Sequence, residues 1–293
     1  MSIEEKLYPL FWTLVLSANA EVSPDELAGM LKSFEPSILL PVHCDDLKRL
    51  GAAFDGGYIV PMEAVRNADY LISFGVAFDW KFEQDFIAEN PRAIVHCYDH
   101  TVSTREIAIY SIEKLIKLVL SPSKYDLREP LKYFSYRRFF PKRASHFKER
   151  VWHTADENSV TVHGVFAKLS IGSRVFLKID IEGSEYRIMD QLPDFFDRID
   201  GMVIEFHDAD INAERLEESI EVIRRAFYVV HVHGNNCGGT SATGFPNIIE
   251  VTFKHKRFFA SEPVASTRVF PVAGLDFPND PHRPDLRLWF DAK

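Results

Sequence analysis

The sequence predicts an α/β protein built on a seven-stranded, mostly parallel sheet of Rossmann-like type, with helices on both faces. From residue 69 onward, short apolar runs alternate with amphipathic segments of helical spacing, which is the pattern of successive β-α-β units. The last two apolar runs are joined only by the loop 234–246, without a helical pattern. We therefore expect those two strands to pair antiparallel at the end of the sheet.

The elements follow in order along the chain. The strands are expected at 70–76, 93–98, 150–153, 174–179, 201–206, 228–233 and 247–254. The helices are expected at 81–89, 103–120, 160–169, 183–191 and 213–226. Before them, the Asp-Gly-Gly of residues 55–57 stands between two apolar stretches and predicts a hairpin. Seven strands that close in an antiparallel pair form the layout of the class I methyltransferases.

Residues 1–48 are expected to form a helical region ahead of a main domain at 49–293. Ser23 is a suitable N-cap, with Pro24 in the first turn. The apolar run at 7–18 is too short to span a bilayer. Residues 18–20 resemble a signal-peptidase site, but residues 2–6 lack the basic stretch that a signal peptide needs. We expect a cytoplasmic protein without a membrane span.

Composition narrows the class of protein further. The chain has 293 residues, 46% of them apolar, so it is long and apolar enough to bury a large core. Its 34 Lys and Arg against 43 Asp and Glu give a net charge of -9, which argues against non-specific binding to nucleic acid. Its three cysteines, Cys44, Cys97 and Cys237, are scattered. They predict neither a disulfide framework nor a paired zinc site, and favour a reducing compartment.

The segment 122–150 differs from the rest of the chain in charge. It has nine basic and three acidic residues, and seven aromatic residues are interleaved with them. One interpretation is a lid that recruits an anionic or sugar-like substrate. The other, which we favour slightly, is an amphipathic helix pair whose aromatic side chains pack inward and whose charges face water.

Ligands of open α/β sheets bind beyond the carboxyl ends of the strands. After the first strand, Gly75 would let a ligand approach the backbone. The second strand ends at Asp99, 24 residues after Gly75, where dinucleotide-binding folds place an acid that holds a ribose diol. The alternative is that Asp99 begins a surface turn before His100 and Thr101.

The fourth strand carries the strongest functional pattern. An apolar strand at 175–179 runs into four charged residues, Lys178, Asp180, Glu182 and Glu185, with Gly183 at the turn. Such charges are costly to bury unless they are paired or bind a ligand. The structural alternative is a buried ion pair between Lys178 and Glu185, with Asp180 or Glu182 capping the next helix.

Residues 177–185 resemble the Lys-Ile-Asp-Val-Glu-Gly-Ala-Glu signature of FkbM-type S-adenosylmethionine-dependent methyltransferases. Segments 49–58, 73–75, 233–236 and 276–279 resemble a largely uncharacterised branch of that family, so the resemblance runs from about residue 49 to the C-terminus. It implies a class I methyltransferase fold that binds S-adenosylmethionine between Gly75 and Asp99, near Asp180. It also implies an oxygen acceptor.

The loop after the first strand departs from the family pattern. Ser73 stands where the family has an acidic residue, and Asp79 stands at the position of the second glycine. We expect Asp79 to replace the missing acid near the amino group of the cofactor. Both residues remain candidates for cofactor binding.

Polar residues also follow the fifth and sixth strands. Asp180, Asp208 and Asn236 come after three neighbouring strands, which loosely resembles the magnesium site of some O-methyltransferases. Glu182, His207 and His233 are the candidates for a general base. The alternative for both histidines is a structural role, with their ring nitrogens bonded to the backbone.

Together these patterns predict an S-adenosylmethionine-dependent O-methyltransferase that acts on a hydroxyl of a sugar or secondary metabolite. The basic segment 122–150 would tolerate an anionic small-molecule or glycan acceptor. Two alternatives remain. One is a methyltransferase-like binding protein without turnover, which the altered first loop favours. The other is a metal-dependent hydrolase that uses His231 and His233, but it leaves the Asp99 spacing and the fourth-strand motif unexplained.

Overall fold

The computed structural model describes residues 36–121, 127–140, 142–288 and 290. Most of the predicted helical region 1–48 lies outside these residues, including the predicted helix start at Ser23 and the apolar run at 7–18. The described part of that region holds a short 3-10 helix, η1 (Pro36–Leu39), and enters the strand β1 (Leu47–Gly51). β1 pairs antiparallel with β2 (Gly57–Pro61), so the predicted hairpin is confirmed.

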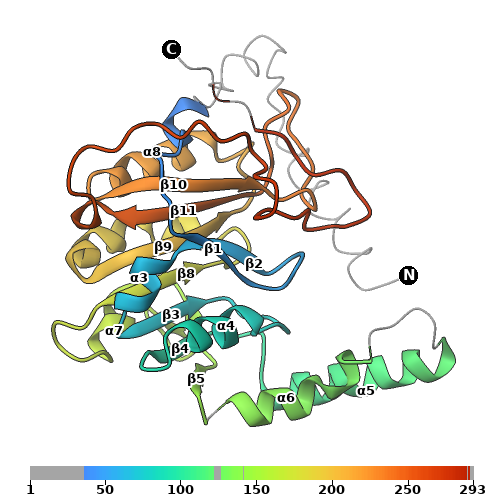
Figure 1. The fold of residues 1–293 in the computed structure, drawn as a ribbon. Helices are drawn as coiled ribbons and strands as arrows, with labels where there is room; N and C mark the ends of the chain where they lie inside the picture. Colours follow the sequence, from blue (N-terminus) through green and yellow to red (C-terminus); the bar gives the residue numbers. More distant parts are fainter. Residues whose placement is uncertain (1–35, 122–126, 141, 289, 291–293) are drawn as a thin grey trace, which may run out of the picture. The chain divides into compact units, whose positions relative to one another are not determined.

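The main sheet has seven strands in the order β10-β11-β9-β8-β3-β4-β5 (Figure 1). Only the pairs made by β11 are antiparallel, because the chain reaches β11 from β10 through a loop without a crossover helix. The predicted class I methyltransferase layout is confirmed by this topology. The strands are β3 (Tyr70–Phe74), β4 (Ile94–Tyr98), β5 (Ala144–Phe147), β8 (Val175–Ile179), β9 (Ile199–Phe206), β10 (Phe227–Gly234) and β11 (Ile249–His255).

The third strand of the sheet is not where the sequence predicted it. The predicted strand at 150–153 contributes only β6 (Arg150–Val151), which pairs with β7 (Ser159–Val160) in a separate small sheet. The edge of the main sheet is β5, because Phe147 stacks on Tyr98 of β4 at 4.7 Å and its carbonyl accepts the N–H of Asp99 at 3.1 Å. β5 therefore lies next to Asp99, a residue of the predicted ligand site.

Helices cover both faces of the sheet. Their bounds are α3 (Met62–Asn67), α4 (Lys81–Glu89), α5 (Thr104–Leu120), α6 (Lys132–Phe139), α7 (Val162–Ala167) and α8 (Ala213–Arg224). The predicted helix at 183–191 is wrong: the chain forms the 3-10 helices η4 (Glu185–Arg187) and η5 (Met189–Arg198). Pro193 lies inside η5 and has no N–H to donate, which disfavours a regular α-helix there. Two further 3-10 helices are η3 (Glu129–Leu131) and η6 (Lys256–Phe258).

One large core lies between α4 and the sheet. Phe82 and Phe86 recur at a spacing of four on α4, so both point to the same side, and Phe86 packs against Phe176 of β8. Tyr58 of β2 and Val95 of β4 belong to the same cluster. Burying a side chain such as Phe86 stabilises the fold by about 1.5–3 kcal/mol, and truncating it to alanine costs about 3–5 kcal/mol.

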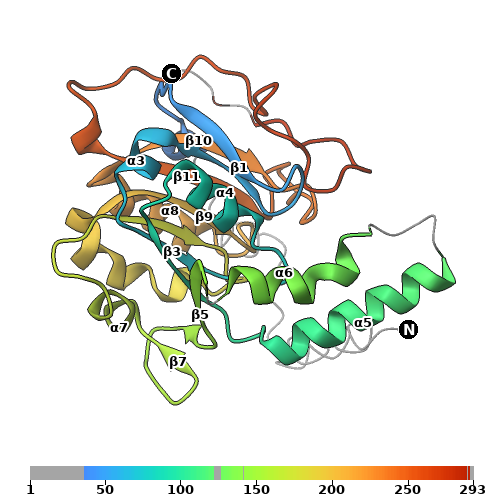
Figure 2. The same cartoon turned by 60° about the horizontal axis from the view of Figure 1, so that its bottom comes forward.

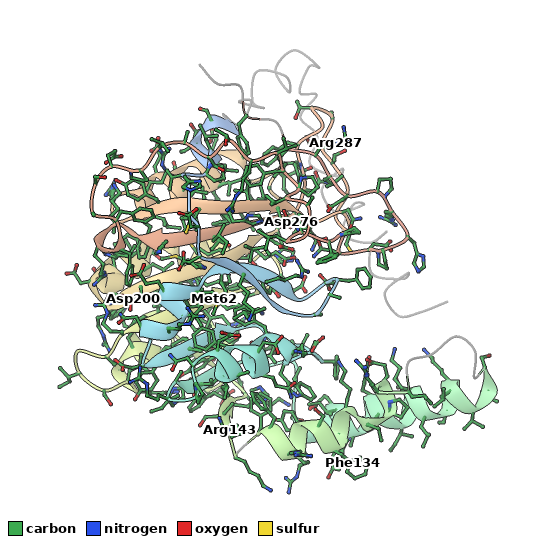
Figure 3. The ribbon with its side chains drawn as sticks, viewed as in Figure 1. Met62, Phe134, Arg143, Asp200, Asp276 and Arg287 are labelled. Atoms are coloured by element: carbon green, nitrogen blue, oxygen red, sulfur yellow. The ribbon has the colours of Figure 1, made fainter. Side chains whose placement is uncertain are left out.

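The helices α5 and α6 lie side by side and extend beyond the β5 edge of the sheet (Figures 1 and 2). Tyr136, Phe139 and Phe140 from this region pack into the core, as the second interpretation of segment 122–150 expects. Phe134 instead faces outward, with 67% of the residue exposed (Figure 3). Among the described residues, no helix has both the length and the apolar character needed to cross a membrane.

Candidate active site

Gly75 brings the ends of two strands together. Its φ of +80° favours glycine, and a Cβ at this position would lie 1.6 Å from the carbonyl oxygen of Asp180. The N–H of Asp180 also donates to the Phe74 carbonyl at 2.9 Å. The absent side chain therefore makes room for the backbone that follows β8, rather than leaving open space for a ligand. As a result, the loop after β3 lies against Asp180.

Asp99 fixes the shape of the loop after β3. Its Oδ2 accepts the N–H groups of Val76 at 3.0 Å and Ala77 at 2.8 Å. Its Oδ1 accepts the N–H and the hydroxyl of Thr101 at 2.8 and 2.6 Å. Burial raises the pKa of Asp99, but these four donors outweigh that and lower it, so the group is ionised at neutral pH. The predicted turn before Thr101 is therefore present at this position.

The acid that stands beside Ser73 is Glu83 of α4. The Ser73 hydroxyl donates to Glu83 Oε1 at 2.7 Å, and both side chains are buried. Glu83 Oε2 is buried and has no hydrogen-bond partner among the residues that the structure describes. Sequence analysis missed Glu83, although its position next to the buried Phe82 on a short helix could have revealed it. Asp79, the residue proposed for this role, is exposed and accepts the Lys81 N–H at the start of α4.

Lys178 pairs with Asp180 rather than with Glu185. Its Nζ donates to the Gly75 carbonyl at 2.8 Å and to Asp180 Oδ2 at 3.3 Å. Burial lowers the pKa of Lys178, but Asp180 and other carboxylates raise it further, so the amine stays charged. The predicted Lys178–Glu185 ion pair is wrong, because Glu185 accepts the N–H groups of Ile181 and Gly183 instead.

Tyr58 joins the two carboxyl groups at the centre of the site. Its hydroxyl lies 2.9 Å from Asp180 Oδ2 and 3.0 Å from Glu205 Oε2. A phenol has one proton, so it can donate to only one of them, and the other contact needs a proton on the carboxyl. Burial and the neighbouring Asp180 raise the pKa of Glu205 well above its usual range. A protonated Glu205 therefore donates to Tyr58, which donates to Asp180.

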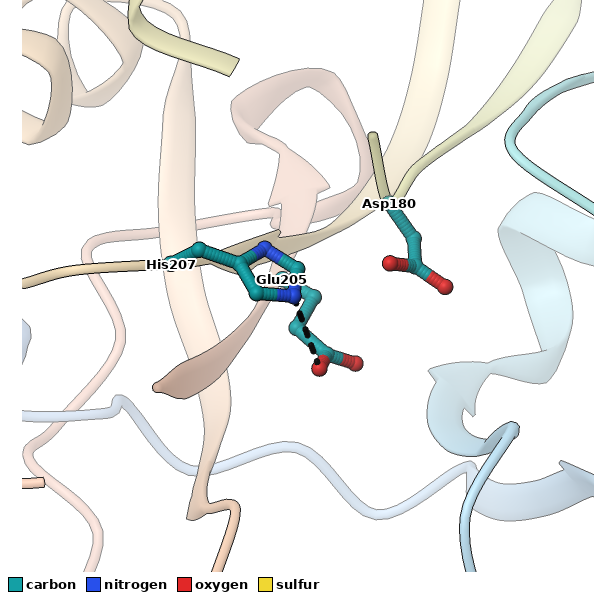
Figure 4. Close-up of side chains that lie close together, drawn as sticks. All are labelled: Asp180, Glu205 and His207. Atoms are coloured by element: carbon teal, nitrogen blue, oxygen red, sulfur yellow. Dashed lines mark ion pairs between the residues drawn. The ribbon is translucent and has the colours of Figure 1, made fainter. Parts of the chain in front are cut away.

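His207 lies among three carboxyl groups. Its Nδ1 is 3.1 Å from Glu185 Oε1, and its Nε2 is 3.4 Å from Glu182 Oε2 and 3.6 Å from Glu205 Oε1 (Figure 4). Burial alone would lower the pKa of His207, but the hydrogen bond with Glu185 and the other acids raise it to about 10. At neutral pH the ring is therefore an imidazolium that donates from both nitrogens. Glu182 differs from its neighbours, because 86% of its side chain is exposed.

His231 and His233 bind the C-terminal tail. His231 Nε2 lies 2.8 Å from Asp276 Oδ1, and His233 Nε2 lies 3.0 Å from Asp285 Oδ1. Burial would lower the pKa of His233, but Glu250 and Asp285 raise it to about 10. The cluster of ligand-type side chains found among the described residues contains neither histidine, so the geometry gives the hydrolase alternative no support.

One member of the predicted metal trio, Asn236, makes its hydrogen bonds to the C-terminal tail. Asn236 uses its side chain on the tail: its oxygen accepts the Asp280 N–H at 2.7 Å, and its amide donates to the Asp280 carbonyl at 3.0 Å. The ligand-type atoms that do lie within 4.8 Å of one another belong to Asp180, Glu205 and His207 (Figure 4). Glu205 was missed because it lies inside a buried apolar strand, where only its charge marks it as unusual.

Residues 107–238 match the family model of the methyltransferase FkbM domain. Residues 107–238 are therefore similar to an FkbM-type methyltransferase domain. The resemblance stated from the sequence is thereby confirmed, and the matched region includes Asp180, Glu205 and His207. Gly75 and Asp99 precede it.

Solved structures similar to this FkbM-type chain are also methyltransferases. They include a precorrin-6y C5,15-methyltransferase from Geobacter metallireducens GS-15 (12% identity, 67% of this chain and 86% of that one, TM-score 0.35). Another is a predicted O-methyltransferase from Agrobacterium tumefaciens (10% identity, 76% and 81%, TM-score 0.32). A comparison with curated proteins finds no match. Sequence identities of 10% and 12% indicate no particular activity for this chain. Its fold follows from its own strand order.

The residues of the FkbM-type site fit a cationic cofactor by charge. S-adenosylmethionine carries a positive sulfonium and a positive amino group, and acidic side chains outnumber basic ones at this end of the sheet. Apart from the protonated Glu205, the acids are Asp180, Glu182 and Glu185, and the bases are Lys178 and His207. Asp99 fits less directly, because its oxygens already accept four protein donors and a ribose diol would have to replace Thr101.

Two cavities lie away from this cluster. One, of about 690 Å³, is lined by Asp46, Glu63, Lys254 and their neighbours. The other, of about 630 Å³, is lined by Tyr186, Arg187, Arg215 and residues around them. Tyr186 lines the second cavity and also contacts the site, because its hydroxyl donates to the His207 carbonyl at 3.0 Å.

Proposed function

We propose that this FkbM-type methyltransferase transfers a methyl group from S-adenosylmethionine to a hydroxyl oxygen of a sugar or secondary metabolite. The observation that carries the proposal is the exposed carboxylate of Glu182, which lies beside the buried Asp180–Tyr58–Glu205 chain. An oxygen acceptor must lose a proton as it is methylated, and Glu182 is an exposed carboxylate that can accept it.

S-adenosylmethionine, when bound, supplies an electrophilic methyl carbon. In this proposal Asp180 faces its positive charge, and the loop that Asp99 orders forms one wall of its site. Lys178 holds Asp180 in place, so that the carboxylate is oriented before the ligand arrives. The protein then needs chiefly to align the acceptor hydroxyl with the methyl carbon.

Glu182 is the base in this proposal. Its φ of +54° is uncommon for a residue with a side chain, and that side chain is 86% exposed. Partial desolvation and the neighbouring Asp180 and Glu185 raise the pKa of Glu182, which suits a base, and the imidazolium of His207, 3.4 Å away, opposes this rise. His207 and His233, the other predicted bases, both have a pKa raised to about 10 and so already hold a proton at neutral pH.

A divalent ion is not needed for this step. The carboxylate oxygens of the Asp180–Glu205–His207 group already face proton donors from Tyr58, Asn235 and His207 itself. Magnesium would have to displace those donors and deprotonate His207. We expect a chelator to leave activity within about twofold of the untreated enzyme, and loss of activity restored by magnesium would contradict this.

Calorimetric titration tests cofactor binding. S-adenosylmethionine has a sulfonium charge that S-adenosylhomocysteine lacks, so Asp180→Asn should weaken the first ligand more than the second, by about tenfold. Asp99→Ala should weaken both, because it releases the loop at Val76 and Ala77. Asp45→Ala is the control, since its side chain is 87% exposed and lines the distant 690 Å³ cavity. A folded protein that binds neither ligand would overturn the proposal.

Turnover distinguishes an enzyme from a binding protein without activity. Methyl transfer to a panel of sugar and phenolic hydroxyls should fall about 10²-fold or more in Glu182→Gln, with cofactor affinity unchanged. Cofactor binding without transfer to any acceptor would favour the binding-protein alternative. The altered loop supports that alternative, because Ser73 and Glu83 replace the usual acid of the family.

A further inference from the structure

The helical hairpin formed by α5, η3 and α6 exposes an unusual amount of apolar surface. Of the 16 large apolar side chains that are exposed in the described residues, nine lie between residues 109 and 134. They are Ile109, Ile112, Leu115, Ile116, Val119, Leu120, Leu127, Leu131 and Phe134. A contiguous apolar surface on a folded protein marks a place where something else binds.

The exposed residues of α5 form one stripe. Ile109, Ile112, Ile116 and Val119 recur at spacings of three and four, so they share a face of the helix, and each is between 47% and 71% exposed. The opposite face of α5 packs against the rest of the protein: Ile107 and Ser111 are buried there, and Ser111 accepts the Tyr133 N–H. Burial against the protein core therefore does not explain the stripe, which is about 15 Å long at 1.5 Å per residue.

The exposed charges of the hairpin are mostly positive. Among described residues 104–143, the exposed charged side chains are seven basic ones and a single acidic one, Glu113. The basic ones are Arg105, Lys117, Arg128, Arg137, Arg138, Lys142 and Arg143. This excess stands out in a chain whose net charge is -9. The apolar surface is thus bordered by positive charge.

We propose that the α5–α6 hairpin docks on the surface of an anionic lipid bilayer. Aliphatic side chains would enter the boundary of the acyl chains, and the long arginine and lysine side chains would reach the phosphate headgroups. A second copy of the chain fits less well, because a symmetric contact would oppose two hairpins of the same positive charge. The proposal rests on this surface alone and does not depend on the methyltransferase activity.

Vesicle sedimentation of the full chain tests the docking. The protein should sediment with vesicles of phosphatidylcholine and phosphatidylglycerol, not with phosphatidylcholine alone, and added salt should weaken the binding. The triple variant Ile112→Ser/Ile116→Ser/Val119→Ser should lose roughly tenfold in partitioning for each side chain that enters the lipid. Arg137→Ala/Arg138→Ala should lose about fivefold per charge.

A matched triple variant controls for general loss of apolar surface. Ile171, Ile211 and Val264 are 103%, 75% and 71% exposed and lie outside the hairpin, so changing all three to serine should leave vesicle binding unchanged. Wild-type protein that fails to bind anionic vesicles, or hairpin variants that bind as wild type does, would overturn the proposal. So would sedimentation velocity showing a wild-type dimer that the Ile112/Ile116/Val119 variant converts to a monomer.

Discussion

Two lysines, buried to the same degree, lie at opposite ends of the sheet. Lys178 and Lys254 are each 5% exposed. Lys178 is near the carboxyl end of β8, whereas Lys254 pairs with Gly201 at the start of β9, because β11 runs antiparallel to it. Lys254 has carboxylate partners in Glu63 at 2.8 Å and Asp46 at 3.2 Å.

The surroundings of the two lysines differ. The two carboxylates that pair with Lys254 are 32% and 55% exposed, so water solvates the part of their negative charge that the lysine does not neutralise. Around Lys178 the carboxyl groups of Glu83 and Glu205 are buried, and burial raises the pKa of both. The pair of Lys178 and Asp180 is therefore surrounded by carboxyl groups that water does not solvate. Such a cluster is costly to bury unless a ligand binds there.

Replacing each lysine in turn is expected to give the largest difference in stability between the two ends of the sheet. Lys178→Met should lower the free energy of unfolding by about 3–5 kcal/mol, because it leaves buried carboxyl groups without a cation. Lys254→Met should cost only about 1 kcal/mol, because Asp46 and Glu63 can be solvated. Urea unfolding of both variants measures the difference. Equal losses of unfolding free energy in the two variants would contradict the difference between the surroundings of Lys178 and Lys254.

Raising the pH should destabilise the end that contains the two histidines. His207 and His233 have a folded pKa of about 10 against an ordinary 6.5, so their contribution is complete below about pH 6.5 and is lost as pH rises through 10. Between pH 7 and 9 we expect a loss of about 2 kcal/mol for each histidine. Urea midpoints across this range test it, and His233→Gln should flatten the slope. A stability that is flat over this range in the wild type would contradict the assignment of both charges.

Tyr58→Phe should break the proton-sharing chain with little change in volume. It leaves Asp180 and the buried Glu205 without their shared partner, which costs about 1–3 kcal/mol. Cofactor affinity should fall as well, because Asp180 loses the hydroxyl that orients it and the proton of Glu205 loses its acceptor. Thermal unfolding and calorimetry measure the two effects. Tyr70→Phe is the control, since its hydroxyl bonds to Ser170, outside the site.

Asp79→Ala should have the smallest effect. The residue accepts the Lys81 N–H at the start of α4, so its loss should cost about 1 kcal/mol, as for other caps. Cofactor affinity should stay within about twofold, because Glu83 is the acid beside Ser73. A large loss of S-adenosylhomocysteine binding without loss of stability would instead place Asp79 in the cofactor site.

Much of the fold follows from periodicity. Six of the seven predicted strands overlap strands of the main sheet, because buried parallel strands give continuous apolar runs. The third strand was missed because Ala144–Phe147 contains two polar residues and is held by Tyr98 and Asp99 of its neighbour. The helix predicted at 183–191 was wrong, because the chain forms 3-10 helices there and Pro193, which follows, has no N–H to donate.

The site was harder to predict than the fold. Asp180, Glu182 and His207 could be named because each follows a strand end, where position alone indicates exposure to a ligand. Tyr58 could not, because its contact with Glu205 joins residues 147 positions apart in sequence. His233 was given a chemical role because nothing nearby in sequence reveals Asp285 as its partner. Distant polar contacts of this kind have no local pattern.

The tail that holds the histidines also bears on when this end of the molecule can form. The amide of Asn279 donates to Asp55, 224 positions earlier, and to Glu250. Asp276, which Figure 3 labels, lies 2.8 Å from the ring of His231. On the ribosome, β3, β4 and α4 emerge and can pack long before Asn279 is made. We therefore expect a growing chain to carry His231 and Glu250 without their tail partners until synthesis is nearly complete, so that the contacts of the tail are among the last to form.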